Sequence, residues 1–128
     1  MPVPAPEPLK GRRVAAPAAA LDDAHWPPGA LVLRLAPDEV LVVGDGPLDV
    51  DDPHAIIEND STFSSLEFSI PDARSVLASL CDWEPPTAIP SLSQGLIAAL
   101  PVKVWFEQDR ILVIVPTPYA HELEERLR

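Results

Sequence analysis

Apolar and polar residues alternate along several short stretches of this chain, with the period of two that is typical of half-buried β-strands. Residues 31–35 (LVLRL) and 40–44 (VLVVG) are β-rich, and the Pro- and Asp-containing turn between them predicts a β-hairpin. A third strand is predicted at residues 63–70, and two more at 95–106 and 111–115, separated by the polar turn EQDR. Within the third strand, Leu66, Phe68 and Ile70 are expected to point inward, and Glu67 and Ser69 outward.

Three other segments have features of helices. From Pro71 onward, apolar residues recur at the i, i+3, i+4 and i+7 positions that share one face of a helix. Thr117 is expected to cap a C-terminal helix that begins at Pro118. Residues 53–60 begin with a proline and predict a short helix, whereas the proline-rich residues 82–90 predict a loop. The residues expected on buried helix faces are Ala73, Val76, Leu77 and Leu80 in the first helix and Ala120, Leu123 and Leu127 in the last.

The predicted elements follow the order ββ(α)βαββα, which indicates an α+β protein with helices packed on an antiparallel sheet. Residues 1–29 differ in composition, because they hold seven of the seventeen prolines and an alanine-rich tract. Proline fixes φ and lacks a backbone donor, so this segment is expected to be an extended or irregular arm rather than a helix. The sequence therefore predicts an N-terminal arm over residues 1–29 and a single α+β domain over residues 30–128.

Two of the predicted strands are apolar on both faces, at residues 41–44 and 111–115. A sheet with one face in water should alternate, so the second face is expected to be covered by the N-terminal arm or by a partner. The alternative is that these are central strands with one or two extra apolar residues. Trp105 is out of phase with its strand neighbours and points away from their side. Together with Trp26 in the arm and Trp83 in the loop, Trp105 is a candidate interface residue.

The charge of the chain narrows the choice of partner. The formal net charge is −11, with nine Lys and Arg against twenty Asp and Glu. Nucleic acids and anionic membrane surfaces are therefore not expected as partners, because both need cationic side chains. Cys81 is the single cysteine, and residues 1–13 contain no apolar signal-peptide core. A soluble, reduced protein in the cytoplasm is the expectation.

No catalytic, cofactor-binding or metal-binding residues are expected from the sequence. The segment Gly44-Asp45-Gly46 is a fragment of a phosphate-binding loop, but Pro47 follows where a helix would have to begin. The nearby aspartates lack calcium-loop spacing, so a solvated acidic loop is expected there. Cys81 has no basic neighbour that would activate its thiol. The three histidines, His25, His54 and His121, are isolated in sequence and predict surface positions rather than metal ligands.

Several ordered blocks of the chain resemble one known family. Residues 31–45 (LVLRLAPDEVLVVGD) are similar to a hairpin of the gamma subunit of heterotetrameric sarcosine oxidase. Residues 59–81 and 89–127 resemble the strand–helix segment and the tail of the same subunit. The blocks depart from the family pattern at Asn59-Asp60-Ser61, and at Ile70, where the family has glycine before the helix proline.

The resemblance implies a small relative of the folate-binding aminomethyltransferase domain. It also implies that larger flavoprotein subunits, related to the alpha and beta subunits of sarcosine oxidase, hold the cofactors. The leading hypothesis is a non-catalytic accessory subunit that assists assembly of a flavin-dependent, sarcosine oxidase-type complex. The alternatives are a stand-alone folate-binding module of one-carbon metabolism and a homodimeric structural protein that covers its second sheet face by self-association.

Overall fold

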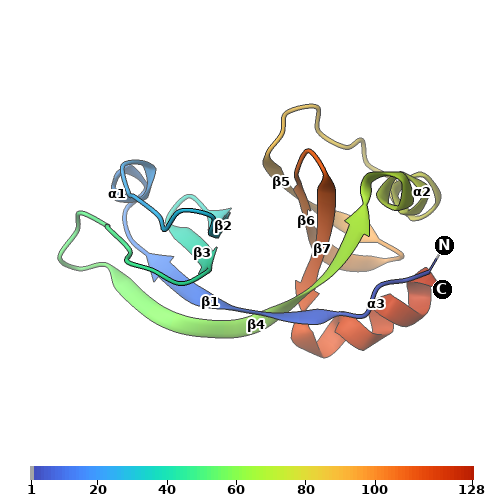
Figure 1. Cartoon of the computed structure of the whole chain (residues 1–128), viewed down its shortest axis with the longest axis horizontal. Coiled ribbons are helices and arrows are strands. Elements are labelled where there is room, and N and C mark those ends of the chain that lie inside the picture. The colour runs from blue at the N-terminus through green and yellow to red at the C-terminus, as the bar shows by residue number, and fades with distance from the viewer. Residues whose placement is uncertain (1) are drawn as a thin grey trace. The chain divides into compact units, whose positions relative to one another are not determined.

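The computed structural model describes residues 2–128 and confirms an α+β protein built mainly on antiparallel strands (Figure 1). The strands are hydrogen-bonded in the order β2-β3-β1-β4-β7-β6-β5. The chain divides into two compact units, which we call the N-terminal unit (Leu9–Ser61) and the C-terminal unit (Thr62–Arg128 with the described residues up to Pro8). The elements are β1 (Glu7–Ala15), α1 (Ala18–Asp22), β2 (Leu31–Ala36), β3 (Glu39–Val43), β4 (Ile56–Ser69), α2 (Ile70–Leu80), β5 (Ser91–Ile97), β6 (Leu100–Phe106), β7 (Arg110–Pro116), the 3₁₀ helix η1 (Thr117–Tyr119) and α3 (Ala120–Leu127).

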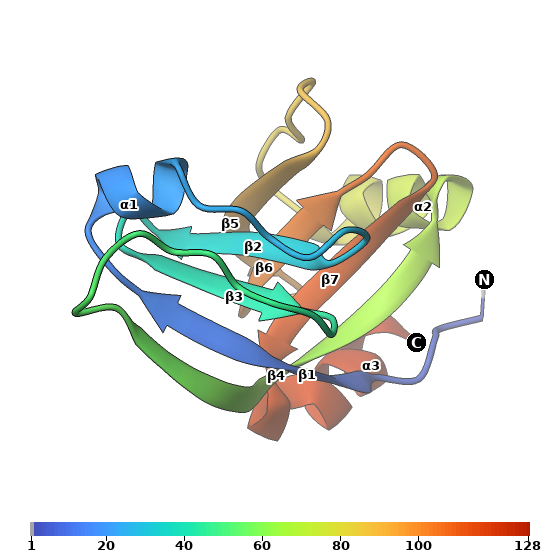
Figure 2. The same ribbon diagram turned by 60° about the vertical axis from the view of Figure 1, so that its left-hand side comes forward.

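The N-terminal unit contains the predicted hairpin, which the structure confirms as β2 and β3. The two strands are antiparallel, and Leu33 lies opposite Leu41. Strand β1 pairs with the other edge of β3, so that β3 lies between β2 and β1 (Figure 2). Helix α1 adds Leu21 to a small core, because this leucine is packed with side chains of β1 and β3. The buried residues of this core are Val14, Ala16, Leu21, Val40 and Val42.

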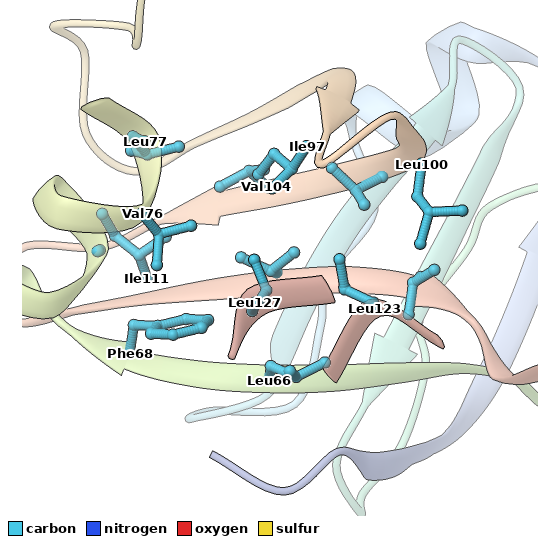
Figure 3. Packing of buried hydrophobic residues seen from close by; sticks show 14 of the residues in the cluster. Leu66, Phe68, Val76, Leu77, Ile97, Leu100, Val104, Ile111, Leu123 and Leu127 are labelled. Atoms are coloured by element: carbon cyan, nitrogen blue, oxygen red, sulfur yellow. The ribbon is translucent and has the colours of Figure 1, made fainter. Parts of the chain in front are cut away.

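The C-terminal unit is built on the strand order β4-β7-β6-β5, with α2 and α3 contributing to one core. Ser69 caps α2 by accepting a hydrogen bond from the Asp72 backbone amide at 3.4 Å. Side chains from β4, α2, β5, β6, β7 and α3 point toward one another in this core (Figure 3). The helix faces predicted from the sequence are confirmed, since Leu80 is partly buried against the core and the other six residues are buried: Ala73, Val76, Leu77, Ala120, Leu123 and Leu127.

Strands β6 and β7 differ in how their two faces are used. Residues of β6 alternate between buried and partly exposed, so Val104 and Phe106 enter the core while Trp105 lies on the opposite face. In β7 all five residues from Ile111 to Val115 are buried. Residues 111–115 are therefore buried on both faces within the described residues, and β7 lies between β4 and β6, which agrees with the alternative of a central strand.

The N-terminal 29 residues differ from the predicted arm. Helix α1 lies within them, so the expectation that this segment has no helix is wrong. Strand β1 is extended, as expected, but it is a paired member of the sheet. Three consecutive alanines followed by a leucine favour a helix, and they come directly after Pro17, with no further proline until Pro27. The compact units divide after residues 8 and 61.

Three further expectations about elements are wrong. Residues 56–60 belong to β4 instead of a short helix, and the β-branched Ile56 and Ile57 are residues that favour strands. Residues 95–106 form two strands, because Ala98 and Ala99 make a turn with φ of 51° and 64°. Thr117 does not cap a helix, and its hydroxyl instead lies 3.0 Å from the Ser64 hydroxyl. The order of elements is therefore βαβββαβββα with a 3₁₀ turn before the last helix.

Candidate functional site

The strongest polar cluster in the C-terminal unit surrounds Trp105 at the end of the β6–β7 hairpin. The Trp105 indole Nε1 donates a hydrogen bond of 2.7 Å to Glu107 Oε1. Arg110 donates two hydrogen bonds to the same carboxylate, from Nε to Oε2 at 2.9 Å and from Nη2 to Oε1 at 3.2 Å. Its third nitrogen, Nη1, donates to Glu67 Oε1 on β4 at 2.7 Å. The indole is therefore held by a network that connects β4, β6 and β7.

The ionisation of this cluster fits a structural role better than a catalytic one. The hydrogen bond from Arg110 lowers the pKa of Glu107, helped by the Trp105 indole and opposed by partial burial. The bonds to Glu107 and Glu67 raise the pKa of Arg110 further above its ordinary value. Near neutral pH, Glu107 is therefore a fully engaged carboxylate with little tendency to take a proton. A group in that state is a poor general acid or base, but it is well suited to fixing an aromatic ring.

Beside this ring the surface forms an open hollow of about 380 Å³, lined by Ile89, Pro90, Trp105 and residues 107–109. Ile89 is 53% exposed, which is high for an aliphatic side chain. The lining thus combines apolar side chains with the two acidic residues Glu107 and Asp109. A pocket with a fixed aromatic ring and a polar rim has the features of a protein-binding hot spot. We call this region the Trp105 surface.

Trp83 has a different environment, on the core side of the same unit. Its ring packs edge-on against Phe106 with 6.3 Å between ring centroids, and it contacts the main core. Its indole Nε1 donates to the Leu96 carbonyl at 3.2 Å. Gly95 in β5 lies directly under this ring, and a Cβ there would be 2.7 Å from Trp83 Cδ1. Trp83 therefore fastens the 82–90 loop to the sheet and core of its own unit.

Trp26 belongs to the N-terminal unit, where it is partly buried against the small core formed by β1, α1 and β3. The other two candidate interface tryptophans, Trp83 and Trp105, belong to the C-terminal unit. Within the C-terminal unit, Trp83 packs on the side of the main core and Trp105 lies on the opposite face of β6. Trp105 lines the open hollow described above.

Groups that could support catalysis or metal binding are dispersed among residues 2–128. No group of three or more His, Cys, Asp or Glu side chains in this range could hold a metal ion. His25 lies near Asp49 and His121 near Glu124, in each case on the surface and with nitrogen–oxygen distances of 3.7 Å. The Cys81 thiol is directed at the Trp83 carbonyl.

No helix in the described part of the chain is long and apolar enough to cross a membrane.

Comparison with known proteins gives a likeness in fold. No family model and no curated protein sequence matches the chain. Among solved structures, it is similar to a subunit of the heterotetrameric sarcosine oxidase from Corynebacterium sp. U-96, determined in complex with pyrrole 2-carboxylate. The TM-score is 0.65 over 95% of this chain and 80% of the matched chain, with 16% sequence identity. The matched subunit is therefore only slightly longer than this chain, and the shared property is the fold.

Sequence reasoning identified Trp105 but missed the residues that position it. Glu107 and Arg110 were assigned to a polar turn, and nothing in the letters EQDR indicates that both ends of the turn engage one indole. A usable signal was present in the hairpin geometry, because residues flanking a tight turn lie opposite one another. The backbone amide of Glu107 donates to the Arg110 carbonyl at 3.0 Å, which places the two side chains together.

Proposed function

We propose that this chain is a non-catalytic accessory subunit, related to the gamma subunit of sarcosine oxidase, in a flavin-dependent complex that acts on sarcosine-like amines. The observation that carries the proposal is the fold shared with a subunit of a heterotetrameric sarcosine oxidase over 95% of the chain. The resemblance of residues 31–45, 59–81 and 89–127 to the gamma-subunit pattern supports the same assignment. In this proposal the larger partner subunits hold the flavin.

The Trp105 surface is the proposed contact with such a partner. The network of Glu107, Arg110 and Glu67 fixes the indole before binding, so little side-chain entropy would be lost on association. Ile89 and Pro90 supply apolar area beside the ring, and Asp109 supplies a negative rim. The complementary partner surface would present an apolar anchor residue flanked by Lys or Arg.

The proposal is tested by affinity capture of the tagged chain from its native cells, followed by mass spectrometry of the captured proteins. We expect large subunits with flavin-binding sequences at a fixed ratio to the tagged chain. Recovery of the chain alone, or only as a homodimer, would contradict the accessory-subunit role. Capture from cells that express an untagged copy gives the background.

The contact surface is tested in the same experiment with two variants. Ile89→Asp places a charge in the hollow without disturbing a buried residue, because the Ile89 side chain is more than half exposed. Trp105→Ala removes the ring, and loss of a hot-spot residue reduces affinity by about thirtyfold or more. Tyr119→Ala is the matched control, since Tyr119 is an aromatic residue that is 48% exposed at η1. If both Trp105-surface variants captured the partner subunits as well as the wild-type chain does, the Trp105 surface would not be the interface.

A further inference from the structure

The N-terminal unit contains an open cavity of about 560 Å³ that the proposed assembly role does not use. Three segments line it: residues 10–12 of β1, residues 44–46 after β3, and residues 59–61 of β4. Its volume is in the range of small-molecule sites. All three segments belong to the same compact unit, so the cavity is a feature of that unit alone.

Glycines shape the walls of this cavity for steric reasons. A Cβ on Gly11 would be 2.5 Å from the Val42 carbonyl oxygen and 3.1 Å from its carbon, so only glycine allows β1 to lie this close to β3. Gly44 and Gly46 have φ of 144° and 123°, a backbone conformation that other residues rarely adopt. A Cβ on Gly46 would also contact Pro27 at 2.9 Å. The cavity is therefore bounded by backbone that side chains could not replace.

Two cations line the cavity without a carboxylate partner. Lys10 and Arg12 are two residues apart on β1 and therefore lie on the same face of the strand. Neither forms an ion pair within residues 2–128. Arg12 uses one nitrogen, Nη2, to donate to the Gly44 carbonyl at 3.1 Å. Its neighbour on the opposite face, Arg13, is paired with Glu39 and Asp60, each at 2.9 Å.

Lys10 and Arg12 are two of the four basic residues that have no ion pair in the described structure, and unlike Arg74 and Lys103 they lie beside one another. Twenty acidic residues are available to nine basic ones, and Arg34, Arg110, Arg126 and Arg128 also have carboxylate partners. In the cavity wall Asp60 is already engaged by Arg13, which leaves Asp45 as the opposing charge. Two cations therefore face one carboxylate that has no ion pair in the described structure. Among the lining groups that have no ion pair, cations therefore outnumber carboxylates by one, in a protein with a net charge of −11.

We propose that this cavity binds a small carboxylate-bearing molecule. Arg12 and Lys10 would hold the carboxylate through charge-assisted hydrogen bonds, for which a planar guanidinium is well suited. Asn59, which lines the β4 side, offers an amide to the polar remainder of the ligand. Asp45 repels a second negative charge, so the site favours a monocarboxylate over a phosphate dianion.

The test is a titration of the isotope-labelled full-length chain with sodium acetate, followed by amide NMR at constant ionic strength set with sodium chloride. We expect saturable shifts of the Gly11, Gly44 and Gly46 amides. Arg12→Gln should weaken acetate binding by about tenfold or more, and Lys10→Gln, which alters an exposed side chain, should weaken it in the same direction. Asp45→Asn should strengthen binding by about fivefold.

Arg74→Gln is the matched control, because Arg74 is an exposed cation on α2 without an ion pair in the described structure, and it should leave the titration unchanged. An equal loss in this variant would mean general attraction of anions. If acetate caused no saturable amide shifts in the wild-type chain, the proposal of a binding site in this cavity would be refuted. A tighter response to inorganic phosphate than to acetate would overturn the assignment to carboxylates. Dispersed amide spectra of the variants show that each one is folded.

Discussion

Gly95→Ala tests whether Trp83 is held by its own unit rather than reserved for a partner. The added methyl group would be 2.7 Å from Trp83 Cδ1 and 2.8 Å from Cε2, well inside van der Waals contact. The indole is a rigid ring and must move as a whole. Its displacement would break the hydrogen bond to the Leu96 carbonyl and the edge contact with Phe106.

The size of the effect follows from these contacts. Loss of the hydrogen bond costs about 1 kcal/mol, and loss of the aromatic pair costs about 0.5–1.5 kcal/mol. Alanine in a strand interior is favoured over glycine by about 0.5–1 kcal/mol. The net expectation is a decrease of about 0.5–2 kcal/mol in the free energy of unfolding. In a Trp83→Leu background the clash is relieved, so Gly95→Ala should be neutral or slightly stabilising.

Urea denaturation followed by far-ultraviolet circular dichroism measures both substitutions in a double-mutant cycle. The account predicts a coupling free energy of about 2 kcal/mol between the two positions. The same cost for Gly95→Ala in both backgrounds would refute the reasoning, since the destabilisation would then have a cause other than Trp83. Circular dichroism is the suitable probe because one variant lacks this tryptophan.

Three other substitutions test the core, the hairpin network and the cavity wall by urea denaturation. Leu123→Ala removes a fully buried side chain and should lower the free energy of unfolding by about 2–5 kcal/mol. Glu125 is exposed, so Glu125→Ala should change this free energy by less than about 0.5 kcal/mol. Equal effects of the two substitutions would contradict the assigned core face. Glu107 has a lowered pKa when folded, so its charge contributes stability above about pH 4.5 that is lost as the pH falls through the folded-state value. Glu107→Gln should therefore lower the free energy of unfolding at pH 7, and the decrease of that free energy below about pH 4.5 should be less steep in the variant than in the wild type. Parallel pH profiles for the two proteins would argue against the network. Gly11→Ala should cost about 1–3 kcal/mol, since its Cβ meets the Val42 backbone, and a neutral result would mean that β1 and β3 can separate.

The parts of the fold that sequence could predict are those where one local rule dominates. Residues 31–43 combine two β-rich runs with a Pro-Asp turn, and both strands formed as expected. Helix α2 was equally well marked, because an early proline and an apolar face at helical spacing agree. The outward position of Trp105 followed from simple alternation along β6.

The parts that failed depend on contacts between distant segments. Ala98 and Ala99 adopt positive φ, which sequence normally signals with Asn-Gly. The strained turn is supported by tertiary bonds instead, since the Ala98 amide donates to the Leu80 carbonyl and its carbonyl accepts from Arg126. These partners are far away in the chain, so no local pattern reveals the turn.

The cavity in the N-terminal unit was missed for the same reason. The Gly-Asp-Gly segment at 44–46 was judged as a nucleotide loop and set aside, because no helix follows it. Its neighbours in space, residues 10–12 and 59–61, come from strands that sequence reasoning assigned to an arm and to a helix. A site assembled from three separate segments becomes visible only when the strand order is known.

The most direct test of the accessory-subunit account is the visible absorbance of the complex captured from native cells, recorded before and after addition of sarcosine. The account predicts that the captured complex has a flavin spectrum that bleaches with sarcosine, and that the separated chain has no visible absorbance. A captured complex without flavin, or a flavin spectrum that belongs to the separated chain itself, would contradict it.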